Sequence, residues 1–545
     1  MADQRHARRR LARAVALVAA GALALTALGG VAGLAGASSP AAKHQASGGD
    51  LKFGLEAETT DYCLARAQLA ISGIQVVSAI YDTLTVPNDK GQATPYLAKS
   101  VTPNADDTQW TIALRPNIKF QDGEPLDATA LKLNLDTYAG LPGGVAASGG
   151  PLFGIYLSFV QSTSIVDPLS VMVTLKKPVA DFPEYLYSTG RMGIQAPAQI
   201  NGACSTNMIG TGPFKLQSYQ QNQATVVVKN PNYWQPGYPK ANSITFVPIP
   251  DGAARNTQLQ GGQIDLTHQS GGLQVDNLKS IPNVKTLTQG PGFREIAHYF
   301  LLTKNAPFNN QLARTAFQLA VNRTEINTIR NKGIFTVANS VMDQKVPGYL
   351  SNAGYPAFNL KKAQQLVSQY KAQNGGQFNV ILGTTTDPDA SAEAQLLKEQ
   401  LGKAGINATI AQFDQATLIN KALSFSIDVL LWRNLYGEYS EAADAETYIW
   451  FQSGSPVNFG GFNDPQIQAL LEQGRAATSP AQAAPIYQQF NRLMAQRGYL
   501  LPTWFVNWTI GYNQSVNLSF PPLPDGHGKP LFAYGRIPVL GLSKS

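Results

Sequence analysis

Short apolar strands alternate with amphipathic helices along most of this chain, and no other feature constrains its fold as strongly. Residues 51–55, 111–114 and 406–410 have strand patterns, whereas apolar residues between 312 and 320 recur at helical spacing. Asp127 stands where the N-cap of a further helix is expected. Because such alternation buries best as helices packed on sheets, it predicts an α/β fold. The 545 residues exceed one ordinary core and predict two or three packed lobes.

The formal net charge is +7, and much of it lies at the extreme N-terminus. Five arginines and one aspartate within residues 1–37 account for +4, which leaves +3 for the rest of the chain. A chain of this size with so small an excess has no reason to bind nucleic acid through bulk charge. We therefore expect no nucleic-acid partner.

The N-terminus has the three-part pattern of a secretory signal. Residues 1–13 are basic, residues 14–36 are uncharged and largely apolar, and Ala35-Gly36-Ala37 offers a small-residue cleavage site. The pattern predicts a signal peptide over 1–37, followed by a flexible spacer over 38–47.

Two details of this segment bear on anchoring. The uncharged run of 23 residues is long enough to span a bilayer, so an uncleaved anchor stays an alternative. Ala37 occupies the position at which a lipoprotein signal would carry its lipidated cysteine, so we expect no lipid anchor. The prediction is an exported protein, periplasmic, secreted or held at the extracytoplasmic face of the cell membrane.

The two cysteines, Cys63 and Cys204, form an even pair in a chain predicted to be exported. Such a pair predicts a disulfide, worth roughly 5 kcal/mol at most in the chain-entropy model. The alternative is two free buried thiols. Neither cysteine has a ligand-type neighbour at metal-binding spacing, and no two of the five histidines lie four residues apart. We therefore expect no metal and no cofactor.

Several stretches resemble, in order, the signature of one protein family. They are residues 79–98 (AIYDTL and PYLA), 107–128, 210–214 (GTGPF), 230–234 (NPNYW), 262–266 (GQIDL), 305–323 and 459–465 (FGGFNDP). Together they are similar to the peptide/nickel-type solute-binding proteins of ABC importers, family 5. The resemblance implies a periplasmic-binding-protein-like two-lobed α/β fold of class II, with an extra subdomain in lobe I.

The resemblance also implies a domain organisation and a function. The expected division is lobe I over 48–88, 208–297 and 508–545, its extra subdomain over 89–207, and lobe II over 298–507. The chain would cross between the lobes near residues 297 and 507. A monomer would capture a small solute, peptide-like or other, in the interlobe cleft and deliver it to an ABC permease in the cytoplasmic membrane.

The candidate ligand contacts lie in three regions that follow predicted strands and should face the cleft. They are Glu56, Thr60 and Tyr62 in the loop after the first strand, His268 and Gln269 after a strand ending at Leu266, and Trp432, Arg433, Glu441 and Asp444 after a strand over 427–431. In peptide-binding relatives the last region supplies an acid that pairs with the ligand amino terminus. Here Glu438, Glu441 and Asp444 compete for that position.

Trp432 and Arg433 should face different ways, because side chains alternate along a strand. We favour Trp432 as an apolar wall for the solute. Arg433 is the candidate for an anionic group, with Glu441 or Asp444 as its partner in the empty state. The alternative is that Arg433 is a solvated surface charge paired with those acids.

Two other classes of function were weighed against solute capture for import. An exported hydrolase is disfavoured, because the sequence has no GxSxG, no metal triad and no paired acid/base motif, and we expect no catalytic residues. A solute sensor without a transport role stays an alternative, because the lipid-anchor cysteine is missing.

Overall fold

The computed structural model describes residues 48–59, 62–67, 69–145, 154–204, 206–434, 436 and 444–545. The predicted signal peptide and spacer, as well as Thr60, Glu438 and Glu441, lie outside the described residues. In the part that is described, no helix is both long and apolar enough to cross a membrane.

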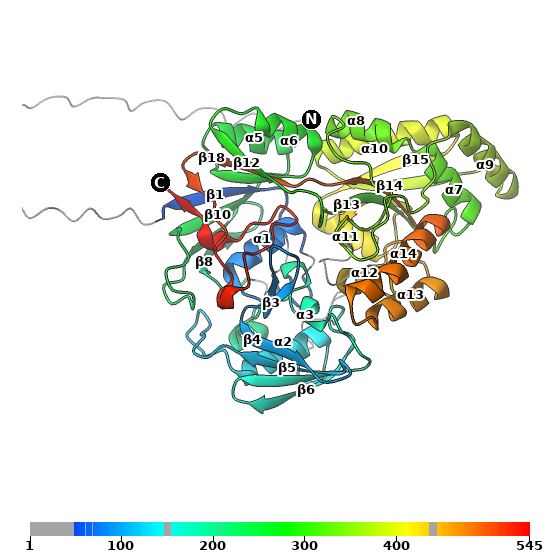
Figure 1. Cartoon of the computed structure of the whole chain (residues 1–545). Coiled ribbons are helices and arrows are strands. Elements are labelled where there is room, and N and C mark those ends of the chain that lie inside the picture. Colours follow the sequence, from blue (N-terminus) through cyan, green and yellow to red (C-terminus); the bar gives the residue numbers. More distant parts are fainter. Residues whose placement is uncertain are drawn as a thin grey trace, which may run out of the picture. The chain divides into compact units, whose positions relative to one another are not determined.

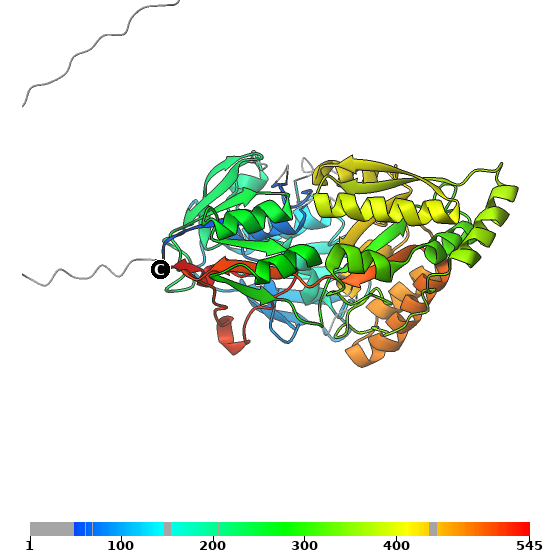
Figure 2. The same ribbon diagram turned by 90° about the horizontal axis from the view of Figure 1, so that it is seen from above.

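A seven-stranded mixed sheet organises the first lobe (Figure 1). In spatial order its strands are β12 (Val284–Thr288), β18 (Thr509–Asn513), β11 (Leu266–Gln269), β1 (Asp50–Leu55), β10 (Ser243–Pro248), β9 (Ala224–Lys229) and β8 (Phe214–Gln220). The central strand β1 pairs in parallel with β10 and β11. The late strand β18 lies antiparallel between β11 and β12, so the C-terminal part of the chain returns to the sheet that holds the first strand (Figure 2).

Three helices pack on this sheet, and together with it they form what we call lobe I. They are α1 (Ile71–Ile80), α5 (Gly252–Gln260) and α6 (Gly272–Lys279). Helix α1 contacts β8 and β9, whereas α5 and α6 contact β11, β12 and β18 (Figure 1). Nearly every residue of α1 is buried, which fits its apolar sequence.

A four-stranded antiparallel sheet forms the subdomain. Its order is β4 (Ala98–Pro103), β5 (Gln109–Leu114), β7 (Ser170–Leu175) and β6 (Val160–Asp167), with α2 (Ala128–Ala139) packed on β6 and β7. Asp127 caps α2 as predicted, because its carboxylate accepts hydrogen bonds from the backbone nitrogens of Thr129 and Ala130.

A second mixed sheet of five strands organises lobe II. Its order is β15 (Asn407–Phe413), β14 (Asn379–Thr385), β16 (Val429–Asn434), β13 (Ile296–Leu301) and β17 (Leu500–Phe505). The helices of lobe II are α7 (Gln311–Ala320), α8 (Arg323–Asn331), α9 (Leu360–Gln373), α10 (Pro388–Ala404), α11 (Gln415–Leu423), α12 (Asp444–Phe451), α13 (Pro465–Arg475) and α14 (Pro480–Arg497). The predicted helix over 312–320 is confirmed as α7.

Short elements complete the chain. They are β2 (Thr85–Pro87), β3 (Ala93–Pro95), α3 (Phe182–Tyr185), α4 (Pro197–Ile200), β19 (Val516–Asn517), β20 (Ser543–Lys544) and the 3-10 turns Ser188–Gly190, Pro524–Gly526 and Val539–Gly541. The chain passes between the two large sheets through residues 289–295, from β12 to β13, and through 506–508, from β17 to β18.

Two strand boundaries were predicted wrongly. We expected His268 and Gln269 to follow a strand, yet β11 begins at Leu266 and includes both. Likewise β16 runs from Val429 to Asn434, so Trp432 and Arg433 lie inside it and not after it. Backbone pairing decides both cases, because β18 continues to pair with β11 and β13 continues to pair with β16 after the apolar residues have ended.

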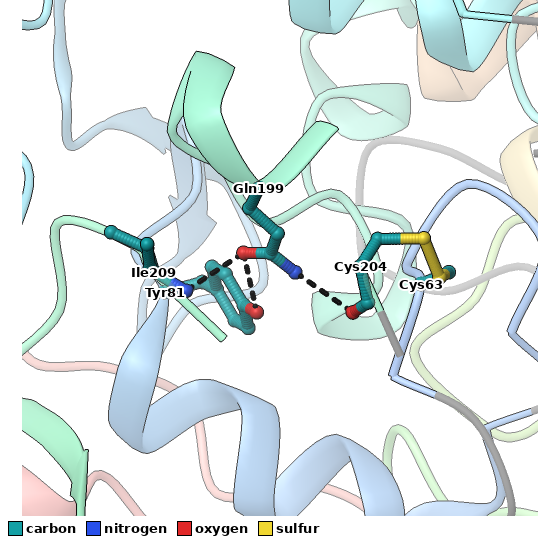
Figure 3. Close-up of a disulfide and its surroundings, with 5 residues drawn as sticks. All are labelled: Cys63, Tyr81, Gln199, Cys204 and Ile209. Atoms are coloured by element: carbon teal, nitrogen blue, oxygen red, sulfur yellow. Dashed lines mark hydrogen bonds between the residues drawn. A yellow bond between two sulfur atoms is a disulfide. The ribbon is translucent and has the colours of Figure 1, made fainter. Parts of the chain in front are cut away.

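The predicted disulfide between Cys63 and Cys204 is confirmed (Figure 3). It joins the loop after β1 to the turn after α4, and the two Cα atoms are 5.0 Å apart. The buried amide of Gln199 holds that turn: its nitrogen donates to the Cys204 carbonyl at 3.3 Å. Its oxygen accepts from the Tyr81 hydroxyl and from the Ile209 backbone nitrogen. The bridge therefore ties a loop of lobe I to a polar hub at the end of α1.

Candidate functional site

A cavity of about 780 Å³ has walls from both lobes. On the lobe I side it is lined by the loop after β1, the end of β11 and the start of α5. Lobe II contributes β16, the segment before α10, and α11. Residues from both crossing segments, Glu295 and Val506, also face it. A concave site of this size, with a few polar groups on an apolar lining, is typical of a small-molecule site.

Arg433 reaches from β16 across the cavity to lobe I. Its Nη1 donates to the Ser270 hydroxyl at 2.8 Å, and its Nη2 donates to the Glu56 carboxylate. Its Nε lies 3.5 Å from the Glu295 carboxylate, and its guanidinium stacks 4.8 Å from the ring centroid of Trp508. The expected partner Asp444 was wrong: Arg433 pairs instead with Glu56 and Glu295 (Asp444 is described below).

The two carboxylates beside Arg433 have opposite pKa shifts. Burial alone would raise the pKa of Glu56, but Arg433, His268, Arg255 and the Ser270 hydrogen bond outweigh it, so the pKa lies below its ordinary value. Burial dominates at Glu295 and raises its pKa to about 7, although Arg433 and the Trp508 indole, which donates at 2.6 Å, favour the charged form. Arg433 therefore lies between one firmly ionised carboxylate and one that titrates near neutral pH.

An aromatic wall borders the cavity on the lobe II side. Trp432, Trp450 and Phe459 pack with ring centroids 5.1 to 6.2 Å apart, in edge-to-face and tilted contacts. Trp432 and Arg433 have different neighbours, in agreement with their alternation along β16, although both line the cavity. Among the described residues, neither the buried Trp432 indole nitrogen nor the buried Asn434 Nδ2 has a hydrogen-bond partner.

The remaining predicted contacts lie in and around the first strand. Gln269 lines the cavity, but its amide is occupied by the protein: it accepts from Arg255 and donates to the Gly252 carbonyl and to Asn256. Its role in this structure is to hold Arg255 against the cavity wall.

His268 and Tyr62 are buried and are not among the described residues that line the cavity. Burial lowers the pKa of His268 to about 4, so the imidazole is neutral at neutral pH, and its Nε2 lies 3.0 Å from the Glu56 backbone nitrogen that donates to it. Tyr62 packs edge-on against Tyr219 at 5.1 Å. In this structure both residues support the loop that carries Glu56.

Asp444 is fully buried and is not among the described lining residues either. It pairs with Arg475 at 3.1 Å and accepts hydrogen bonds from Tyr185 and Tyr487. Thr60 and Glu441 lie outside the described residues, so their predicted contacts stay predictions.

Sequence reasoning missed several charged lining residues. Glu295 could have been found, because it stands beside a predicted crossing between the lobes. Arg255 and the ion pair of Arg330 with Glu393, at 2.8 Å, carry no local signal, because they come from within helices. No group of three or more potential metal ligands occurs within the described ranges.

A family profile described as "Bacterial extracellular solute-binding proteins, family 5 Middle" matches residues 92–457. The chain belongs to this family. The resemblance stated from the sequence is thereby confirmed, and with it solute capture outside the cytoplasm for an ABC importer.

Individual relatives agree with this assignment. The glutathione-binding protein GsiB of Shigella boydii serotype 4 is 26% identical over 457 residues, which are 82% of this chain and 84% of that protein. A binding protein from A. tumefaciens in complex with agropinic acid has a TM-score of 0.77 at 23% identity and covers 91% of this chain and 99% of its own. A dipeptide-binding protein from Pseudoalteromonas in complex with Met-Leu has a TM-score of 0.78 at 17% identity, covering 91% and 100%. The last two likenesses confirm the two-lobed fold alone.

Proposed function

We propose that this family 5 protein captures a small solute that carries both an ammonium and a carboxylate group in the 780 Å³ cavity between its lobes. The observation that carries the proposal is the cavity lining, which combines an excess of carboxylates with unpartnered donors on an aromatic wall. We further propose the residue boundaries given above for the lobes and the subdomain, and export without a lipid anchor.

The charge of the lining favours a ligand with a cationic group. The described lining residues include seven carboxylates and four guanidinium groups, with no lysine or histidine. Burial raises the pKa of Asp387, whose carboxylate caps α10 through the Ala390 nitrogen at 2.9 Å. A ligand ammonium beside Asp387 would stabilise its charged form, as any nearby cation does.

The unpartnered donors favour a ligand with an anionic group. The Trp432 indole N–H and the Asn434 amide N–H lie two residues apart on β16 and belong to lining residues. A buried donor without a partner costs free energy, and a bound carboxylate would accept from both. Trp432 would then supply a donor as well as the apolar wall expected from the sequence, while Arg433 keeps its pairing to Glu56.

Calorimetric titration of the ligand-free protein tests the solute class. The probes are the dipeptide Met-Leu, glutathione and agropinic acid, together with N-acetyl-Met-Leu and Met-Leu amide, each of which lacks one charge. We expect a free zwitterion to bind and each capped form to lose affinity about thirtyfold or more, because an unpaired buried charge then remains. Capped and free forms that bind within twofold of each other would refute the proposal.

A matched pair of variants tests the role of Trp432. Both Trp432 and Trp450 line the cavity, but the Trp450 indole already donates to Glu446 at 2.8 Å within the protein. Trp432→Phe should weaken solute binding about tenfold or more, and Trp450→Phe far less, because only Trp432 has a free donor. Equal effects would remove Trp432 from the site and leave only wall packing.

We also propose that the solute is released unchanged, without catalysis. Mass spectrometry of the solute recovered after prolonged incubation with the protein should return the input mass alone. A product that accumulates with protein concentration would contradict this.

A further inference from the structure

We propose that Phe159, Tyr185, Asp444 and Arg475 form a latch between the subdomain side of the chain and lobe II, which sets the balance between closed and open lobes without touching the solute. Asp444 and Arg475 belong to α12 and α13 of lobe II. Phe159 and Tyr185 flank the subdomain strands β6 and β7. None of these four residues is among the described residues that line the cavity.

The centre of the latch is a closed ring of hydrogen bonds. The Tyr185 hydroxyl donates to the Asp444 carboxylate, Arg475 Nη2 donates to the Tyr185 oxygen at 2.7 Å, and Arg475 Nε donates to Asp444 at 3.1 Å. Tyr185 and Asp444 are fully buried, and only 6% of Arg475 is exposed. Burial raises the pKa of the Tyr185 hydroxyl well above its ordinary value, so it remains a donor at any physiological pH. Charge-assisted bonds without competing water are the strong ones.

Aromatic contacts extend the latch across the same boundary. The Arg475 guanidinium lies 4.8 Å from the Phe159 ring centroid and 5.6 Å from that of Tyr185. At the exposed rim, Lys177 pairs with Glu472 of α13 at 3.2 Å. A rim pair of this kind contributes little, so the buried ring carries most of the interaction.

The latch can open without leaving a buried charge alone. When lobe II moves away, Asp444 keeps Arg475 and also keeps Tyr487, whose hydroxyl donates at 3.1 Å from α14 of the same lobe. The bonds lost are those of Tyr185 and the ring contacts of Phe159. Opening therefore avoids the large penalty of an orphaned buried carboxylate, and the latch tunes the equilibrium without locking it.

The two tyrosines provide a matched test. Tyr185→Phe and Tyr487→Phe each remove one hydroxyl donor from the same carboxylate, but only the first breaks a bond between the moving parts. Spin labels on the exposed positions Ser164 of β6 and Ala469 of α13, attached by chemistry that spares the disulfide, report lobe separation in the ligand-free protein by pulsed EPR. We expect the closed-to-open ratio to fall about ten- to a hundredfold in Tyr185→Phe, and less than twofold in Tyr487→Phe.

A second variant keeps the test decisive if Tyr185→Phe unfolds. Phe159→Leu removes the ring that faces Arg475 and should shift the distances in the same direction. Unchanged distances in both Tyr185→Phe and Phe159→Leu, or an equal shift in Tyr487→Phe, would overturn the latch. Because the readout needs no solute, its outcome is independent of the proposed solute class.

Discussion

Removal of the disulfide should destabilise the protein by about 3–5 kcal/mol. The variant Cys63→Ser/Cys204→Ser opens a loop whose ends are 141 residues apart. For a loop of that length, the chain-entropy model gives about 5 kcal/mol at 25 °C from the greater freedom of the unfolded chain. The lower end of the range allows for residual order in the unfolded state, which reduces the entropy that the bridge removes.

Denaturant unfolding of the oxidised protein and of the double variant measures this difference. Fluorescence and circular dichroism should give coincident transitions, so that a two-state free energy is defined, and the free-energy difference follows from the two midpoints. Thiol titration of the denatured, unreduced parent is the control and should find no free thiol. A difference below about 1 kcal/mol would refute the entropic reasoning, and two reactive thiols would remove the bridge itself.

Three further predictions follow from the charged residues and the N-terminus. Because the pKa of Glu295 is raised to about 7 in the fold from an ordinary value of 4.5, the folded state holds a proton that the unfolded state has lost; its contribution to stability is complete at low pH and is lost as pH rises toward and through 7. The stability of the parent relative to Glu295→Gln should therefore fall between pH 5 and 7.5, by up to about 3 kcal/mol in urea unfolding, and a flat difference would contradict the buried, proton-binding carboxyl. Arg433→Met leaves Glu56 and Glu295 buried together and should cost about 3–5 kcal/mol, whereas the control Lys177→Met, which breaks an exposed ion pair, should cost less than about 1 kcal/mol; similar losses would mean that Arg433 is a solvated surface charge. Intact-mass analysis of the exported protein should show either cleavage near Ala37 or retention of the apolar run, and a diacylglycerol adduct would overturn the prediction of an unlipidated N-terminus.

The sequence was sufficient for the α/β class, the export signal, the disulfide and the family, because each has a local or an ordered signature. It was not sufficient for strand ends. The apolar run before Trp432 ends at Leu431, yet β16 continues to Asn434 because Ile296, Ala297 and His298 of β13 pair with its last residues. A polar residue that is paired on a neighbouring strand has no periodic signal of its own.

The predicted site illustrates a second limit of the same kind. Arg433 and Glu56 were both candidates, but their pairing joins residues 377 positions apart, so proximity along the chain favoured Asp444 as the partner instead. His268 was a candidate because it is a polar residue beside a strand. The structure uses its neutral ring to accept the Glu56 backbone N–H, a role that has the same sequence pattern as a ligand contact.

The crossing segments provide a rule that would have improved the prediction. A residue that flanks a passage between two lobes lies between them wherever the chain goes next, so Glu295 and Val506 face the cavity by topology alone. Glu295 is also the residue whose charge is least compatible with burial, and it is held beside Arg433 from the opposite lobe wall. A polar side chain at such a passage costs free energy unless a partner meets it, so its presence at a crossing indicates where the opposing lobe, or a solute, must supply that partner.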